Sequence, residues 1–185
     1  DELISIFKTT GNDNIFLATR NGMAICFNEN DARAVGRTAS GVKAIDLADG
    51  DYVVGAEPVR EDSKVLLVTD GGYGKCTDLT SFRIQHRGGK GLKAYKITEK
   101  TGNIIGISMV NDSEELIMVT SEGVVIRIRI KDIATTTGRI TQGVRLINLN
   151  DGVIVVSMDK ISAEDTVEEE SEENNTEVTA ETTEE

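Results

Sequence analysis

The sequence has little of what most catalytic, metal-binding or membrane proteins use. Its 185 residues include no tryptophan, one proline, two cysteines and one histidine, and aromatic residues make up only 4%. Cys26 and Cys76 are too few for a disulfide framework, and together with His86 they cannot supply the four ligands of a structural zinc site. No apolar run approaches the length of a membrane span, and the N-terminus has no signal-peptide pattern. We therefore expect a soluble, intracellular chain without zinc or thiol chemistry.

Positive charge is missing from the C-terminal end of the chain. Residues 161–185 contain 11 of the 32 acidic residues and none of the 20 lysines and arginines. The first 160 residues carry 20 bases against 21 acids, a balance of −1, although the whole chain has a net charge of −12. Because this end also has few apolar residues, we expect a disordered acidic tail. Such a tail either keeps the chain soluble or competes with nucleic acid for a basic surface.

The usual catalytic constellations are also missing. The glycine cluster at 71–75 lacks the first glycine of a phosphate-binding loop and a following helix, so it is interpreted as a hairpin turn. The acidic cluster at 46–51 has no glutamate at the twelfth position of a calcium loop. His86 has no serine or cysteine nucleophile at a motif-defining position. We expect no catalytic residue, no metal site and no cofactor in this chain.

Two motifs recur with one period. The pattern Thr-x-x-Gly begins at Thr19, Thr69 and Thr120, and its glycines are 50 and 51 residues apart. The pattern Arg-x-x-x-Gly begins at Arg37, Arg87 and Arg139, and its glycines are 50 and 52 residues apart. A third, β-rich run follows each pair of motifs, and residues 3–6 resemble a further copy of it. The chain is therefore predicted to hold three repeats, 10–60, 61–110 and 111–160, preceded by the last strand of an earlier one.

A period near 50 with several short β-segments predicts an all-β, propeller-like fold. In the second repeat we expect strands at 64–69, 72–77, 91–97 and 103–110, which together make one four-stranded blade. Short helical turns are expected only at 30–35 and 131–135. The glycines Gly22, Gly72 and Gly123 suit tight hairpins between the first two strands of each repeat.

Alternation along residues 125–130 predicts a strand with one packed face. Ile126, Ile128 and Ile130 fall on one side and two arginines on the other. Lys75 stands at the position occupied by isoleucine in the other two repeats, so either a bulge at Gly74 turns it outward or its stem is buried. The bulge is the favoured interpretation. Cys26 and Cys76 occupy equivalent strand positions.

The segment 83–93 is the strongest candidate for a binding site. Arginine forks and lysine point charges bind phosphate, and glycines let the backbone approach it closely. No aromatic residue is interleaved, so stacking on single-stranded bases is not expected. The alternative is a solvated loop whose glycines only satisfy turn geometry. The candidate DNA-binding residues in this loop are Arg83, Gln85, His86, Arg87, Gly88, Gly89, Lys90, Gly91 and Lys93.

Residues 85–91 read Gln-His-Arg-Gly-Gly-Lys-Gly, which resembles the Gln-Arg-Arg-Gly-Gly-Lys-Gly box of DNA gyrase A, with His86 in place of an arginine. Asn21-Gly22, the segments 70–75 and 138–144 and the acidic tail are similar to the C-terminal domain of gyrase A. This resemblance covers residues 1–160 and the tail. It implies a six-bladed β-pinwheel whose basic perimeter bends and wraps duplex DNA without reading its sequence. The box of the family lies in the first blade, whereas residues 85–91 fall in the next-to-last blade, so this loop is either the principal box or a second, box-like loop.

The resemblance also implies the partners and setting of the chain. These are double-stranded DNA, the rest of gyrase A, and gyrase B in a heterotetramer, in the bacterial cytoplasm at the nucleoid. ATP and magnesium belong to the holoenzyme, and the cleavage tyrosine of this type II topoisomerase lies upstream of this segment. Further contacts on the other blades are expected from Arg37, Lys43, Lys75, Arg127, Arg129, Arg139 and Arg145. The alternatives are the equivalent C-terminal domain of topoisomerase IV, and a propeller whose rim binds protein.

Overall fold

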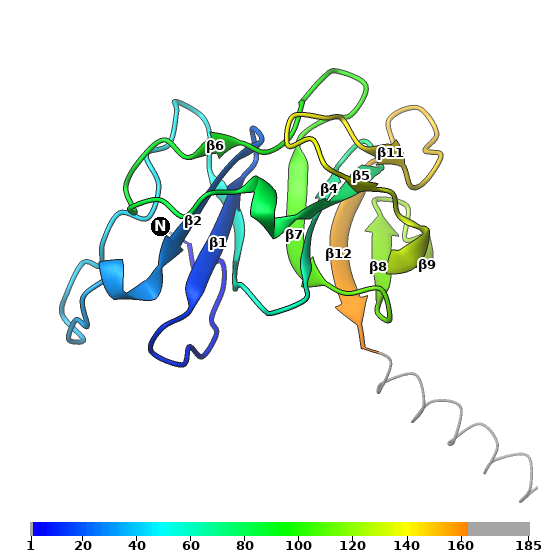
Figure 1. Cartoon of the computed structure of the whole chain (residues 1–185). Coiled ribbons are helices and arrows are strands. Elements are labelled where there is room, and N and C mark those ends of the chain that lie inside the picture. The colour runs from blue at the N-terminus through cyan, green and yellow to red at the C-terminus, as the bar shows by residue number, and fades with distance from the viewer. Residues whose placement is uncertain (1, 163–185) are drawn as a thin grey trace, which may run out of the picture.

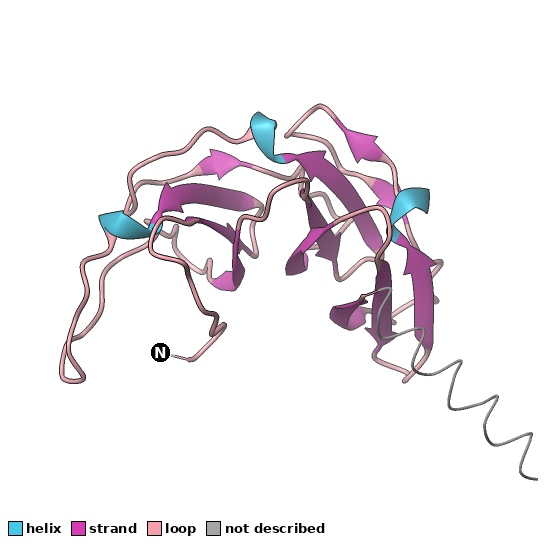
Figure 2. Ribbon diagram, turned by 60° about the horizontal axis from the view of Figure 1, so that its bottom comes forward, coloured by secondary structure: helices cyan, strands magenta, loops and turns pink. Residues whose placement is uncertain are grey.

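The computed structural model describes residues 2–162, which form β-strands and three short 3-10 helices. Three sheets stand side by side in an arch, seen from two directions in Figure 1 and Figure 2. The predicted all-β fold is confirmed. Apart from its first two residues, the acidic tail lies outside the described residues. The strands are β1 Asn14–Thr19, β2 Met23–Asn28, β3 Val53–Pro58, β4 Lys64–Thr69, β5 Tyr73–Asp78, β6 Leu92–Lys93, β7 Ile104–Val110, β8 Glu115–Thr120, β9 Val125–Arg129, β10 Thr135–Thr136, β11 Val144–Arg145 and β12 Val155–Ile161.

The first and second sheets each contain strands from two successive repeats. The first sheet has the order β3-β1-β2-β6, the second has β7-β4-β5-β10 with β11 also pairing with β5, and the third has β12-β8-β9. Thus β6 of the second repeat pairs with β2, while β10 and β11 of the third repeat pair with β5. The prediction that four strands of one repeat make one blade is wrong for the outermost strand. The sequence pattern of this strand indicates an extended segment, but the strand with which it pairs depends on how the repeats stack.

The Thr-x-x-Gly motif closes the hairpin of each repeat. The hydroxyls of Thr19, Thr69 and Thr120 accept hydrogen bonds of 3.2, 3.2 and 3.1 Å from the backbone N–H four residues later. The glycine of each motif has positive φ, at 87°, 76° and 80° respectively, which residues with a Cβ rarely adopt. The hairpin turns predicted from the sequence are confirmed.

The cores lie between neighbouring sheets. Phe16 of β1 and Phe82 meet edge to face at 4.9 Å between ring centroids, and Val65 and Leu67 of β4 pack in the same cluster. The opposite face of β4, with Leu66, packs toward the third sheet. The middle sheet is therefore buried on both faces. In β9 the predicted alternation holds, since Ile126 and Ile128 are half-buried and the two arginines are exposed.

The inner strands β3, β7 and β12 lie side by side, and the strands donated by following repeats lie at the opposite side of their sheets. The 3-10 helices run along the convex side of the arch in Figure 2. They are η1 Glu29–Asp31, η2 Leu79–Ser81 and η3 Ile130–Asp132. The first and third overlap the two predicted helical turns, and η2 was not predicted. No helix within residues 2–162 is long and apolar enough to cross a membrane.

Residues 2–9 do not form the strand that was expected at 3–6. A strand needs a hydrogen-bonded neighbour, and this segment pairs with none of the strands described. Its contact with the first sheet is a hydrogen bond of 3.4 Å from the backbone N–H of Ala56 to Ser5 Oγ. Leu3 and Ile6 are exposed.

Candidate nucleic-acid interface

The basic loop 83–93 of the second repeat lies across the outer edge of the first sheet. The backbone N–H of Gln85 donates to the carbonyl of Cys26 at 2.7 Å, and β6 then pairs with β2 through Met23 and Lys93. The backbone of residues 86–89 runs beside residues 43–46 of the first repeat. Gly88 N donates to the carbonyl of Ala44 at 2.6 Å, and the carbonyl of Gly89 accepts from Asp46 N at 2.9 Å. The loop is thus built into the junction between two repeats.

Arg87 joins these two segments with its side chain. Its Nε donates to the carbonyl of Asp31 at 2.8 Å, and its Nη1 donates to the carbonyl of Lys43 at 3.1 Å. The side chain is half-buried. Arg87 therefore contributes to packing between repeats, because its guanidinium satisfies carbonyls of the preceding repeat.

The three glycines of the loop serve different purposes. Gly88 and Gly91 have positive φ, at 78° and 73°, whereas Gly89 does not. A Cβ on Gly91 would lie 2.4 Å from the carbonyl oxygen of Ala24, while a Cβ on Gly89 would meet nothing closer than 3.8 Å. Gly143 of the third repeat is equally close to the carbonyl of Gly74. The glycine of the Arg-x-x-x-Gly motif therefore lets the second and third repeats approach the sheet before them, whereas a Cβ on Gly41 of the first repeat would meet nothing within 4 Å.

Four basic side chains of the loop face solvent. Arg83, Lys90 and Lys93 are exposed, and the His86 side chain is 98% exposed with Nδ1 3.2 Å from Asp31 Oδ2. Gln85 does not join them, because its Oε1 is buried without a hydrogen-bond partner among the described residues. The candidate contact set of this loop is therefore narrower than the sequence predicted.

The prediction that a bulge at Gly74 turns Lys75 outward is wrong. Lys75 is fully buried, and the pairing of β4 with β5 runs without a register shift from Lys64 opposite Asp78 to Val68 opposite Gly74. Its Nζ donates to the carbonyl of Arg139 at 2.5 Å and to Thr141 Oγ1 at 3.1 Å, and lies 5.3 Å from the Tyr95 ring centroid. Burial lowers the pKa of Lys75 to about 8. The amine holds the loop of the third repeat and is closed to DNA.

The remaining candidates differ in how far they are already paired. Arg127 forms an ion pair with Glu115, and Arg129 pairs with Asp132 at 2.8 Å. Lys43 pairs with Asp46 at 3.0 Å, and hydrogen bonding from Lys43 lowers the pKa of that carboxyl. Arg37 is exposed and Arg139 is half-buried. Arg145 is exposed and donates to Tyr73 Oη at 3.1 Å.

Comparison with known proteins gives the family. The model of the DNA gyrase C-terminal domain, beta-propeller, matches residues 13–60, 63–111 and 114–162. The chain belongs to this family. It is 46% identical over 167 residues to DNA gyrase A of Staphylococcus epidermidis, covering 89% of this chain and 19% of that protein. It is 47% identical over 149 residues to DNA gyrase A of Ureaplasma parvum, covering 80% of this chain and 18% of that one.

Two solved structures share the arrangement of sheets. One is described as the C-terminal domain of DNA topoisomerase IV, with a TM-score of 0.81, 27% identity, and coverage of 91% of this chain and 53% of that chain. The other is a DNA gyrase A C-terminal domain, with a TM-score of 0.75, 26% identity, and coverage of 81% and 51%. The chain thus spans about a fifth of the gyrase A proteins and half of these solved domains.

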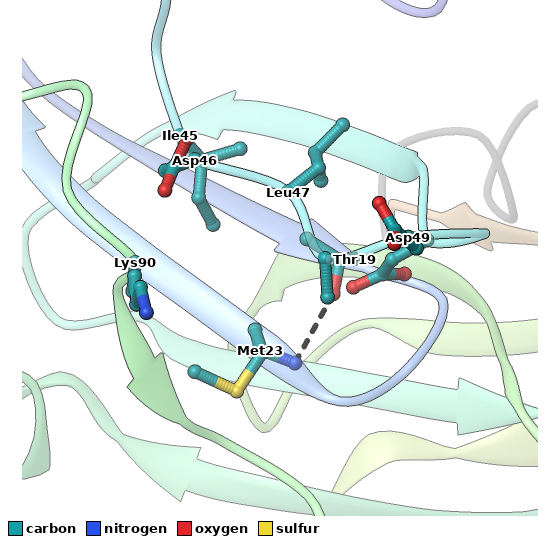
Figure 3. Close-up of a pocket in the computed structure, with 9 residues that line it drawn as sticks. Thr19, Met23, Ile45, Asp46, Leu47, Asp49 and Lys90 are labelled. Carbon is teal, nitrogen blue, oxygen red and sulfur yellow. Dashed lines mark hydrogen bonds between the residues drawn. The ribbon is translucent and has the colours of Figure 1, made fainter.

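A pocket of about 380 Å³ lies beside the basic loop of this gyrase-family domain. Figure 3 shows Lys90 together with Asp46 and Asp49 around it, and Asp51 also lines it. Three carboxylates make this hollow unsuitable for a phosphate. They place negative charge next to Lys90, so an anion would be repelled from the pocket and could approach only the outer edge of the loop.

The groups that hold the loop in place could not be recognised in the sequence. The carbonyls of Asp31 and Lys43 fix Arg87, and the Asp31 carboxylate accompanies His86. Backbone carbonyls have no sequence signal, and the contact depends on how successive repeats stack. Lys100 was also not predicted from the sequence. Its Nζ lies 5.5 Å from the centroid of the Tyr73 ring.

Proposed function

We propose that this gyrase-family domain binds duplex DNA along the outer edges of its sheets and bends it. The observation that supports this most is the repeated placement of exposed cations where each repeat crosses the sheet before it. Lys93 on β6 and Arg145 on β11 occupy equivalent positions beside β2 and β5, two residues after Gly91 and Gly143. In Figure 1, β6 and β11 lie along the same side of the molecule. A duplex following this side would meet a basic loop at each junction.

The chemistry of this surface favours phosphates over bases. The described residues contain no helix longer than three residues, so they offer no recognition helix to enter a major groove. Lysine and arginine on loop edges contact the sugar-phosphate backbone, which positions DNA without reading its sequence. Any preference between sequences then arises from the energy of bending each one.

The relatives supply the larger setting for this proposal. Because the chain matches about a fifth of DNA gyrase A, we place it in that protein, which would act with gyrase B in a heterotetramer. In that assembly the bent duplex would be presented to a cleavage centre carried by other residues, for ATP-dependent negative supercoiling in the bacterial cytoplasm. ATP and magnesium would bind outside this chain. We assign its repeats to 10–60, 61–110 and 111–160 and an acidic segment to 161–185, which we propose to be disordered.

The test is a titration of the full chain with several unrelated duplexes at two salt concentrations. Phosphate contacts release counterions, so the slope of log affinity against log salt should be about −0.9 for each phosphate neutralised. We expect a steep slope and similar affinities for all duplexes. Binding restricted to one sequence, or no binding at low salt, would contradict the proposal and favour a rim that binds protein.

A further inference from the structure

Two cations converge on one tyrosine at the outer edge of the second sheet. The Nζ of Lys100 lies 5.5 Å from the centroid of the Tyr73 ring, and Cζ of Arg145 lies 5.6 Å from it. Arg145 Nε also donates to Tyr73 Oη at 3.1 Å, and its Nη1 donates to Asn148 Oδ1 at 2.8 Å. Hydrogen bonding from Arg145, and then from Lys100, lowers the pKa of the Tyr73 hydroxyl. The side chains come from β5, β11 and the turn 98–102, so the fold brings them together from two repeats.

This convergence has no compensating carboxylate. Neither Lys100 nor Arg145 forms an ion pair with any acidic residue in the part of the chain from 2 to 162. Both are exposed, whereas Lys43, Lys64, Arg127 and Arg129 each pair with an acid. Two like charges beside a neutral oxygen repel each other, and an anion placed between them removes that repulsion.

The equivalent place in the first sheet has one cation, Lys93, with carboxylates nearby in place of a second cation. Met23 stands there in place of Tyr73, and Asp49 and Asp51 line the pocket beside it. The turn that carries Lys100 is also longer, with four residues between Ile97 and Gly102 against two between Leu47 and Gly50. The cation pair is therefore a feature of the second sheet and is not a consequence of the repeat.

We propose that Lys100 and Arg145, held against the Tyr73 ring, form a binding site for a single phosphodiester phosphate of the bound duplex. This deepens the proposed function and rests on it. The Nη2 side of the Arg145 guanidinium has no partner among residues 2–162, and an ammonium offers three donors, so both can share one phosphate. Arg145 on β11 and Lys93 on β6 lie on the same side of the molecule, so the site is continuous with the outer edges of the sheets along which we propose that DNA binds. Contact with the Tyr73 ring restricts the conformations of both side chains in the free protein.

The test compares the full chain with Lys100→Gln, Arg145→Gln and the double variant, using Lys8→Gln in the exposed segment 2–9 as a control that removes one positive charge, as each single variant does. If both cations serve one phosphate, the double variant should lower the salt slope by about 0.9 and not by about 1.8. Lys8→Gln should leave it unchanged. Circular dichroism and thermal unfolding of each variant check that the fold is kept.

A second measurement locates the anion. In chain labelled with 13C-tyrosine, the Tyr73 resonance should shift when duplex DNA is added, because the two exposed cations against its ring would bind the phosphate. The resonance of Tyr95, whose ring lies against the fully buried Lys75, should not shift. If the wild-type chain binds DNA and the double variant binds it with the same affinity and salt slope, the proposed phosphate site is wrong while the proposed function still holds. A Tyr73 shift with inorganic phosphate but not with DNA would assign the site to a free anion and overturn the phosphodiester. A wild-type chain that does not bind DNA would overturn the proposed function itself.

Discussion

Within the basic loop, Arg87 and Lys90 are three residues apart but have different surroundings: Arg87 donates to backbone carbonyls and Lys90 is exposed. Arg87→Ala removes two hydrogen bonds to backbone carbonyls, so we expect a loss of about 1–2 kcal/mol of stability, measured by denaturant unfolding. Lys90→Ala removes an exposed cation, so stability should be unchanged while the DNA salt slope falls by about 0.9. Equal stability of both variants would show that Arg87 is not a structural contact.

Gly91 and Gly89 form a matched pair for testing how closely the loop must approach the sheet. Gly91→Val places a Cβ against the carbonyl of Ala24 at a positive φ, and should cost about 2 kcal/mol or more in thermal unfolding. Gly89→Val has room and needs no positive φ, so its melting temperature should stay near that of the wild type. If Gly89→Val destabilised as much as Gly91→Val, close approach would not be the reason for the glycine.

Lys75 gives a pH dependence with a defined sign. Its folded-state pKa of about 8 lies below the ordinary 10.5, so the unfolded chain binds the extra proton more readily between these values. Stability should therefore fall as pH drops from about 10.5 to about 8, by up to about 3 kcal/mol, with no further loss from this group below that range. Lys75→Met should lack this dependence in denaturant unfolding at several pH values. The same pH profile in both proteins would remove Lys75 as its source.

At the scale of elements, local features were predictable and contacts between repeats were not. The hairpins at Thr19, Thr69 and Thr120 follow from residues within one turn, so the sequence indicated them correctly. The destination of β6 and the burial of Lys75 depend on segments 63 to 70 residues distant in the chain, which no local pattern encodes. A lysine in a strand is predicted to be exposed, and only the structure shows that carbonyls of the next repeat accept hydrogen bonds from the buried Lys75 amine.

The candidate site divides in the same way. Glycine spacing and the cationic residues marked the loop, and its exposed cations Arg83, Lys90 and Lys93 remain candidates for phosphate contact. Sequence alone could not separate these from Arg87, whose guanidinium faces protein carbonyls. Lys100 was missed because it falls outside the repeated motifs, in a turn that is longer than its counterpart in the first repeat.

At the scale of the whole molecule, the acidic segment should weaken DNA binding. Residues 161–185 carry 11 carboxylates and the rest of the chain is close to neutral, so we expect the segment to compete with DNA for the same cations. Truncation after Lys160 should tighten binding at low salt, measured by fluorescence anisotropy, and the difference should fade as salt screens the charges. Equal affinities of the truncated and full chains at low salt would leave the segment a role in solubility only.

Bending of the duplex along the outer edges of the sheets is tested most directly by ring closure with DNA ligase. A duplex of about 150 base pairs is near the persistence length and closes slowly unless it is bent. At saturating protein we predict that the full chain accelerates closure, and that Lys93→Gln combined with Arg145→Gln reduces the acceleration while the fold remains intact. A duplex that is fully bound yet closes no faster than free DNA would contradict the account.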